Sequence, residues 1–245
     1  MKKYIALLLT FFTFCSILGC TSQKKEELIQ VSGVYFDTVI QIQAWDADPD
    51  VLENCKKMCQ EYENKFSTEI PTSEIAQINS AHGNPVNVSD ETIDILKTAL
   101  YYCKLSNGKF DITIAPVSKL WDFNGEHSGT LPNSEDISNA LTHVGYQNIV
   151  LNGNSVTLLD PEAQIDLGGI AKGYIADRLK EYLLSMNVHH ALINLGGNIL
   201  AVGIEWNISV FTSYIFCASS SVMSMPFCFF TIIWIVSMPR APSVA

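Results

Sequence analysis

The sequence predicts an α+β domain, with mixed sheets and packed helices rather than a regular array of alternating strands and helices. Apolar residues recur at helical spacing in several segments, and short runs rich in β-branched residues lie between them. One Asn-Gly pair separates two such runs, which is typical of a tight hairpin. The 245 residues are 48% hydrophobic and only 16% charged, which favours a packed core over disorder.

The N-terminal half is expected to hold one strand and two helices. Residues 33–44 are rich in β-branched and aromatic side chains and form the predicted strand. A helix is expected to start at Asp48, because apolar residues then follow on one face: Val51, Cys55, Met58, Tyr62 and Phe66. A second helix is expected to start after Ser89, a residue type that caps helices, and to end before Gly108.

The C-terminal half is expected to combine hairpins with helices. The predicted elements, in chain order, are a helix over 133–145, strands over 148–151 and 155–159, a strand ending at 165–167, a helix over 170–186 and strands over 191–195 and 199–202. The pair Asn152-Gly153 is placed at the turn between the first two of these strands. This mixture supports the α+β class.

The first residues have the order of a secretory signal. A positively charged start precedes an uncharged apolar run over 5–18, which is short for a membrane-spanning helix. The Leu-Gly-Cys sequence that follows resembles the lipobox of bacterial lipoproteins, in which the cysteine carries the lipid. We expect residues 1–19 to be a lipoprotein signal peptide and residues 20–32 a polar linker. Lipidated Cys20 would then hold the protein at the extracytoplasmic face of a cell membrane; an ordinary signal peptide is the alternative.

Residues 204–245 differ in composition from the domain predicted over residues 33–203. No Asp, Glu, Lys or Arg occurs between Trp206 and Pro239, and neither a helical nor a strand period persists there. The segment is long enough to span a bilayer. Three alternatives fit it: a transmembrane tail, a buried core segment, or a translated wrong reading frame. The motifs described below favour the last.

The charge balance and the cysteines exclude some classes of site. The formal net charge is −10 and no basic patch compensates it, so we expect no nucleic-acid partner. Of the seven cysteines, Cys55 and Cys59 share one side of the first predicted helix. No Cys-x-x-Cys pair and no histidine at zinc spacing accompanies them, so we expect buried thiols rather than metal ligands.

One glycine motif combines groups that suit a phosphate ligand. Residues 166–174, Asp-Leu-Gly-Gly-Ile-Ala-Lys-Gly-Tyr, place a carboxylate at a strand end, two glycines at a turn and a lysine in the first turn of a helix. Glycines let a ligand approach the backbone, and helix-start amides beside an ammonium group favour phosphate. Asp166 is suited to accept hydrogen bonds from a ligand or to support a metal ion. The alternative is a simple strand-to-helix turn with a solvated lysine, since the P-loop spacing is missing.

A second motif brings an aromatic ring and an acid together after a helix end. It spans residues 108–116, Gly-Lys-Phe-Asp-Ile-Thr-Ile-Ala-Pro. Phe110 is suited to stack on a planar ring while Asp111 accepts from ring N–H groups; alternatively, Phe110 belongs to the core and Asp111 caps a turn. A third glycine turn, Asn-Leu-Gly-Gly-Asn over 194–198, leaves the same ambiguity, and the His-His pair at 189–190 is expected to face solvent.

Several motifs follow one another along the chain. They are the lipobox, Phe-Ser-Thr-x-x-x-x-Ser-Glu-Ile (66–75), Gly-x-Phe-Asp-Ile-Thr (108–113), Val-Gly-Tyr (144–146), the glycine motif (166–174) and Asn-Leu-Gly-Gly-Asn (194–198). In this order, from about residue 33 to 203, they resemble the ApbE-like FAD:protein FMN transferases, once labelled thiamine biosynthesis lipoproteins. The resemblance implies an α+β flavin transferase domain. It also implies an enzyme that uses FAD and Mg2+ to attach FMN to a Thr or Ser hydroxyl of a target flavoprotein, with release of AMP.

The resemblance implies a role for each matching residue. The residues expected to contact FAD are Lys109, Phe110, Asp111, Asp166 and Lys172. A main-chain oxygen of the glycine turn would help to hold Mg2+, and the resemblance assigns it to Gly169, with Ala171 as the alternative. Two positions depart from the family pattern: Phe36 stands where a methionine is expected, and Glu69 replaces an aromatic residue.

The end of the chain departs further from the family pattern. The family's other Mg2+ ligands, an Asp and a Thr in a later His-x-x-Asp-x-x-Thr-Gly-like segment, have no match after Gly203. We therefore expect a truncated or frameshifted end and impaired transfer, because a hard cation needs several oxygen ligands. The rival hypothesis is a non-enzymatic, lipid-anchored extracytoplasmic ligand-binding protein, which has no reason to carry the Phe-Asp and Asp-Leu-Gly-Gly motifs together.

Overall fold

The computed structural model of the chain describes residues 27–121 and 131–203. The predicted signal peptide, the lipidation site Cys20 and the uncharged tail at 204–245 lie outside these residues. Among the described residues, no helix is both long and apolar enough to cross a membrane.

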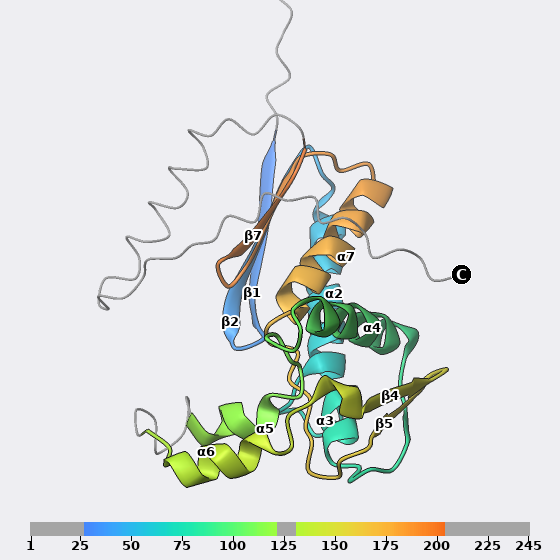
Figure 1. Cartoon of the computed structure of the whole chain (residues 1–245). Coiled ribbons are helices and arrows are strands. Elements are labelled where there is room, and N and C mark those ends of the chain that lie inside the picture. The colour runs from blue at the N-terminus through green and yellow to red at the C-terminus, as the bar shows by residue number, and fades with distance from the viewer. Residues whose placement is uncertain (1–26, 122–130, 204–245) are drawn as a thin grey trace, which may run out of the picture.

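A four-stranded antiparallel sheet forms the upper part of the molecule (Figure 1). Its strands, in spatial order, are β1 (Leu28–Tyr35), β2 (Thr38–Trp45), β6 (Ala191–Leu195) and β7 (Asn198–Val202). Two helices, α2 (Pro49–Phe66) and α7 (Ala171–Ser185), pack against this sheet and against each other. Ile40 and Ile42 of β2 are fully buried there. The main hydrophobic core therefore lies between sheet and helices, as the α+β prediction requires.

The single strand predicted over 33–44 is wrong, because a hairpin occupies this region. Phe36 and Asp37 both adopt φ of 54°, and the pair Tyr35 and Thr38 closes a two-residue turn between β1 and β2. Such left-handed turns usually carry Gly, Asn or Asp, so Asp37 is the one sign of this turn in the sequence, and Phe36 gives none. The Phe36 N–H donates to Glu63 Oε1 of α2 at 2.7 Å, which fixes the turn. Strand β1 also includes residues 28–32, which were expected in the linker.

A smaller antiparallel sheet lies in the lower part of the molecule (Figure 1). Its order is β3 (Val86–Asn87), β5 (Ser155–Leu158) and β4 (Ile149–Asn152), and it lies near α3 (Glu74–Asn79) and α4 (Asp90–Leu105). The predicted hairpin is confirmed, but its turn lies one residue later than predicted. Asn152 pairs with Ser155 at the end of β4, so Gly153 and Asn154 are the turn residues, with φ of 57° at Gly153. The second predicted helix is confirmed as α4, but the Ser89 side chain does not cap it.

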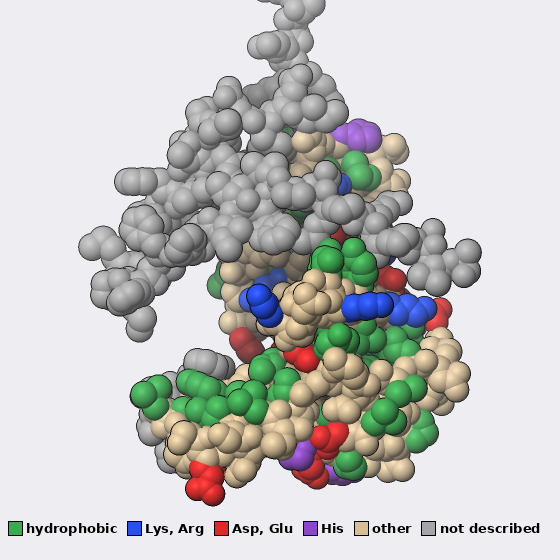
Figure 2. Space-filling view, viewed as in Figure 1, with side chains coloured by type: hydrophobic (Ala, Val, Ile, Leu, Met, Phe, Trp, Pro, Cys, Tyr) green, Lys and Arg blue, Asp and Glu red, His purple; other side chains and the backbone are tan. Residues whose placement is uncertain are grey.

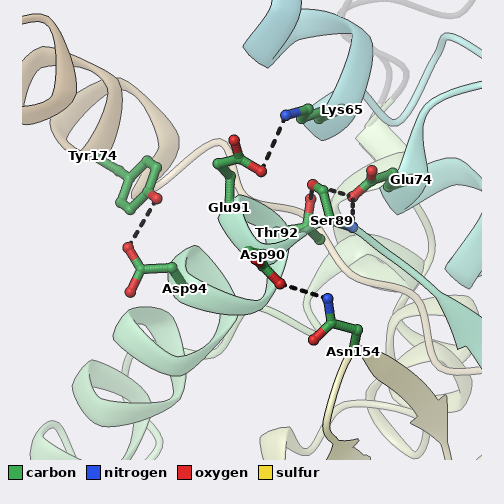
Figure 3. Close-up of polar contacts among 9 residues, drawn as sticks. All are labelled: Lys65, Glu74, Ser89, Asp90, Glu91, Thr92, Asp94, Asn154 and Tyr174. Carbon is green, nitrogen blue, oxygen red and sulfur yellow. Dashed lines mark hydrogen bonds and ion pairs between the residues drawn. The ribbon is translucent and has the colours of Figure 1, made fainter. Parts of the chain in front are cut away.

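The first turns of α4 join four other parts of the fold through polar contacts (Figure 3). The pairs are Ser89 with Glu74 of α3 (2.9 Å), Asp90 with Asn154 of the β4–β5 turn (2.6 Å), Glu91 with Lys65 of α2 (3.3 Å) and Asp94 with Tyr174 of α7 (2.9 Å). The Ser89 hydroxyl therefore binds the Glu74 carboxylate instead of the helix end. This explains why its predicted capping bond is missing.

Short helices complete the fold: α5 (Ala115–Ser118), the 3-10 turns η1 (Lys119–Trp121) and η2 (Tyr146–Asn148), and α6 (Ser134–Leu141). The helix predicted over 133–145 starts as expected, with the Asn133 side chain accepting from the Asp136 N–H, but α6 ends at Leu141. Figure 2 shows hydrophobic side chains gathered over the α5–α6 region. Leu131 and Leu141, which flank or end α6, are both exposed.

The cysteines of the described residues are buried free thiols, as predicted. Cys55 and Cys59 are fully buried on α2, and Cys103 is fully buried on α4. Desolvation raises the pKa of Cys55 and of Cys59 to about 12, so both thiols stay protonated and unreactive at neutral pH. The His-His pair at 189–190 is exposed, also as predicted.

Candidate functional site

The first predicted site segment begins where α4 ends. The Gly108 N–H donates to the Cys103 carbonyl at 2.9 Å, while Asn107 takes the left-handed conformation with φ of 54°. This is the usual way to stop a helix and reverse the chain. The Ser106 hydroxyl oxygen then accepts from the Phe110 N–H at 3.0 Å. The helix end therefore determines where the segment after Gly108 runs.

The second predicted segment is held by a buried asparagine. Asn79, at the end of α3, donates from Nδ2 to the Ile165 carbonyl at 2.8 Å, and its Oδ1 accepts from the Ile165 N–H at 2.7 Å. The strand predicted to end at 165–167 is therefore wrong, because a side chain takes the place of a neighbouring strand. A parallel bridge between Ile114 and Gln164 joins this segment to the first one.

The two segments lie side by side, although they are far apart in the sequence. The Asp166 N–H donates to the Ile112 carbonyl at 2.8 Å. The Phe110 ring lies against the glycine bend, since a Cβ built on Gly169 would be 3.0 Å from Phe110 Cε2. That separation is tighter than ordinary side-chain contact, so the absent side chain makes room for the ring. The aromatic ring and the glycine bend therefore form one site.

The glycine bend is exposed and leads into a helix. Asp166 Oδ1 accepts from the Gly168 N–H at 2.7 Å, which turns the carboxylate back over the bend. Gly168 and Gly169 are exposed, whereas Asp166 is half-buried. Helix α7 starts at Ala171, and among the described residues Ile170 gives it no side-chain capping bond. The Ala171 N–H donates to the Leu167 carbonyl at 2.8 Å, so the N–H groups that follow it in the first turn are the ones that suit an anion.

Two lysines accompany the bend and the ring. Lys172 lies half-buried in the first turn of α7, and the exposed Lys109 precedes Phe110. Within residues 27–121 and 131–203, neither ammonium group forms an ion pair with an acid. Lys172 therefore adds positive charge to the helix start, where the helix dipole already favours an anion.

Asp111 is largely occupied by hydrogen bonds from its own chain. Its Oδ1 accepts from the N–H and the hydroxyl of Thr113 at 2.9 and 2.7 Å, and its Oδ2 accepts from the Tyr146 N–H at 2.8 Å. A carboxylate has about four acceptor positions. Asp111 therefore organises a turn, as one alternative expected, and keeps one acceptor position on Oδ2 for a ligand.

Tyr174 anchors the first turns of α7 to α4 (Figure 3). Its hydroxyl donates to Asp94 Oδ2 at 2.9 Å, and its ring makes edge contacts with Tyr62 and Phe66. The Arg178 guanidinium, one turn further along the helix, lies over the same ring at 5.2 Å from its centroid. Burial raises the pKa of Tyr174 and the hydrogen-bonded Asp94 carboxylate raises it further, so the hydroxyl keeps its proton and continues to donate.

The other sequence-predicted positions lie in turns. Gly196, with φ of 62°, closes the β6–β7 hairpin, and a Cβ there would collide with the Thr38 side chain. Phe36 lies in the β1–β2 turn and Glu69 is exposed after α2. These observations explain why Gly196 must be glycine, and they assign no chemistry to Phe36 or Glu69.

The described residues do not form a magnesium site by themselves. No group of three or more His, Cys, Asp or Glu side chains that could hold a metal ion occurs within residues 27–121 and 131–203. The glycine bend offers the Asp166 carboxylate and the Gly169 main-chain oxygen, whereas Mg2+ takes about six oxygen ligands in an octahedron. The remaining oxygen ligands of the ion would have to come from groups other than these two.

Sequence reasoning missed Asn79 and Thr113. Thr113 stands inside the Gly-x-Phe-Asp-Ile-Thr motif, and its spacing from Asp111 is typical of a local side-chain hydrogen bond. This spacing was therefore enough to suggest from the sequence that Thr113 binds the Asp111 side chain. Asn79 gives no such signal, because its partner Ile165 is brought close only by the fold.

Comparison with known proteins agrees with the motifs. A model of the ApbE family matches residues 36–225, which includes part of the segment after Gly203. An FAD:protein FMN transferase of Klebsiella pneumoniae is 34% identical over 182 residues, covering 73% of this chain and 57% of the relative. Another from Vibrio cholerae is 27% identical over 206 residues, covering 79% of this chain and 61% of the relative.

Solved structures agree with the observed fold. The flavin transferase ApbE from Vibrio cholerae superposes with a TM-score of 0.68 at 26% identity, covering 74% of this chain and 60% of that protein. The ApbE protein from Thermotoga maritima gives a TM-score of 0.67 at 28% identity, covering 73% and 60%. This chain thus spans 57–61% of the length of these relatives. With the family match extending over residues 36–225 of 245, the chain belongs to the ApbE family.

Proposed function

We propose that this chain carries the FAD site of an FAD:protein FMN transferase. In the reaction, a Thr or Ser hydroxyl of a target flavoprotein attacks the FAD phosphorus next to riboflavin. The bond from this phosphorus to the oxygen of the AMP phosphate breaks, AMP leaves with that oxygen, and the hydroxyl proton passes to solvent. FMN remains joined to the target through a phosphodiester. The observation that carries the proposal is the contact between the Phe110 ring and the glycine bend at Gly169.

This contact gives a dinucleotide two different surfaces to bind. An aromatic ring suits the planar isoalloxazine, and an exposed helix start with a lysine suits the diphosphate. Phe110 would stack on the flavin, and Asp166 and Lys172 would hold its phosphate side. Asp111 would accept one flavin hydrogen bond at its remaining position on Oδ2, and Lys109 would contact the same part of the ligand.

Phosphoryl transfer of this kind depends chiefly on positioning and on neutralising charge. The described residues contribute positioning of FAD and one ammonium group on its phosphate side. We propose that the reaction depends on Mg2+, with the main-chain oxygen of Gly169, or alternatively Ala171, among its ligands. When bound, the metal would neutralise charge on the diphosphate. Because no match to the family's other metal ligands was found in the sequence, we expect transfer to be impaired.

The location of the protein is part of the proposal. The signal-like start and Cys20 support a lipid anchor at the extracytoplasmic face of a cell membrane. The partners would then be FAD, the membrane, and an extracytoplasmic flavoprotein that offers the acceptor hydroxyl.

The proposal is tested by incubating the purified full chain with FAD and Mg2+. We expect flavin to be retained through a desalting column while little or no AMP is released. Lys172→Ala should lower retention about tenfold by removing the phosphate-side charge. Lys180→Ala on the same helix is the matched control and should retain flavin as the unmodified chain does.

Other results would correct the proposal in different ways. A chain that retains no flavin contradicts the FAD site itself. Steady AMP release would support the transferase and contradict the expected impairment. Equal losses in the Lys172→Ala and Lys180→Ala variants would mean that the helix start does not bind the phosphates.

A further inference from the structure

We propose that Thr113 is a positioning residue of the flavin site, and this inference rests on the proposed function. Its side chain joins Asp111 to the turn formed by Gly145 and Tyr146, an arrangement we call the Thr113 clasp. The clasp would hold the Asp111 carboxylate in the one orientation that leaves an acceptor position for FAD.

The directions of the hydrogen bonds in the clasp are fixed by chemistry. The Gly145 N–H can only donate, and it donates to Thr113 Oγ1 at 2.7 Å. The Thr113 hydroxyl must therefore direct its own hydrogen at Asp111 Oδ1, which also lies at 2.7 Å. The Thr113 N–H donates to the same oxygen, and the Tyr146 N–H donates to Oδ2. The carboxylate is thus held from both sides and cannot rotate without breaking bonds.

The turn of the clasp also contacts the chain on both sides of Phe110. The side chain of Tyr146 lies over Gly108, since a Cβ built there would be 3.8 Å from Tyr146 Cε1. Asp111 is bound to the backbone of the same Tyr146. Phe110 lies between Gly108 and Asp111 in the sequence, so the turn contacts the chain on both sides of the residue whose ring meets Gly169.

Removing the hydroxyl would leave two groups without their partner. Thr113 is fully buried, so water cannot easily replace it. The Gly145 N–H would lose its acceptor, and Asp111 Oδ1 would lose one of two donors. We expect the carboxylate and the turn to take several orientations, which weakens a ligand that needs one of them.

The fold supplies a matched control in Thr92. This residue is also fully buried, in the first turn of α4, but within residues 27–121 and 131–203 its hydroxyl makes just one long contact, at 3.4 Å from Ser89 Oγ. Among the described residues, it forms no hydrogen bond with the glycine bend or with the Phe110 segment. A valine at 92 therefore tests the cost of a buried Thr-to-Val change away from the site.

The test compares Thr113→Val, Thr113→Ser and Thr92→Val in the full chain, by titrating FAD and following flavin fluorescence. Thr113→Val should raise the FAD dissociation constant about tenfold or more, because two hydrogen bonds in the clasp are lost. Thr113→Ser keeps the hydroxyl and should bind within about twofold of the unmodified chain. Thr92→Val should bind FAD unchanged. Hydrogen exchange at the Gly145 and Tyr146 amides should become faster only in Thr113→Val.

The outcomes separate this inference from the proposed function. If the unmodified chain binds FAD and Thr113→Val binds equally well, with unchanged exchange at Gly145, the clasp has no positioning role. If Thr113→Val does not fold, Thr113→Cys, which keeps a weak donor of similar size, should show the loss, and full binding there would overturn the inference. If the unmodified chain binds no FAD, the proposed function fails first and the clasp loses its flavin role with it.

Discussion

At the scale of single residues, the site depends on a glycine, which has no side chain, in the bend beside the aromatic ring. Gly169 lets the Phe110 ring approach the bend, and an added Cβ would be only 3.0 Å from the ring. The ring would then have to shift by a few tenths of an ångström. Stacking on a planar ligand is sensitive to such shifts, because the attraction depends on the separation and offset of the two rings.

Gly169→Ala should therefore weaken FAD binding several-fold while changing the free energy of unfolding by less than about 1 kcal/mol. The matched control is Gly153→Ala in the β4–β5 turn, where a Cβ would meet nothing within 4 Å but φ is 57°. That control should cost about 1 kcal/mol of stability without affecting FAD. Fluorescence titration and chemical unfolding measure both quantities. Equal FAD affinity in both variants would remove the role assigned to Gly169.

At the scale of elements, polar side chains form many of the contacts between helices and sheets. The first turns of α4 contact α2, α3, α7 and the β4–β5 turn (Figure 3). A second link joins the end of α6 to the end of β5, where His143 Nδ1 lies 2.8 Å from Asp160 Oδ2. His143 lies two positions before Gly145, so this link adjoins the turn of the Thr113 clasp in the sequence.

The Asp160 link predicts a pH dependence of stability. The pKa of the Asp160 carboxyl lies below its ordinary value of about 4. The hydrogen bond from the Glu162 N–H is the larger cause, and the hydrogen bond with His143 is the second. A carboxyl whose pKa is lowered by folding stabilises the protein above its ordinary pKa, and this contribution is lost as pH falls through the lower folded value. Asp160→Asn should make the free energy of unfolding fall less steeply below about pH 4.

Urea unfolding at a series of pH values measures this slope. His143→Ala is the companion variant and should flatten the slope less than Asp160→Asn, because the Glu162 N–H makes the larger contribution. Identical slopes in all three proteins below pH 4 would show that the link does not couple folding to protonation.

Elements were predictable where the local signal was strong. Asp48 marked the start of α2, the strand over 191–195 is β6, and the helix over 170–186 differs from α7 by one residue at each end. The hairpin at Phe36 and Asp37 is hard to predict because Phe36 is not a residue type that favours a left-handed turn, and the Gly that usually accompanies Asp there is missing. The segment at 165–167 was misassigned because Asn79, remote in sequence, satisfies its backbone.

At the scale of the whole molecule, the fold brings together motifs that the sequence keeps apart. The α+β class followed from the mixture of hairpins and helices, and the solved structures confirm it. The family followed from the order of the motifs, and the family match confirms it. The contact of Phe110 with Gly169 could not be read from the sequence, because it depends on a parallel bridge between Ile114 and Gln164. The roles of Asp166 and Lys172 are predictions, which flavin retention by Lys172→Ala and a structure with bound FAD test.

The most direct test of the account is a crystal structure of the full chain with FAD. We expect the isoalloxazine to stack on Phe110 and the diphosphate to lie at the bend between Asp166 and Lys172, within hydrogen-bond distance of the first N–H groups of α7. FAD bound elsewhere on the protein, or a closed bend that makes no contact with added FAD, would contradict the assignment of this site.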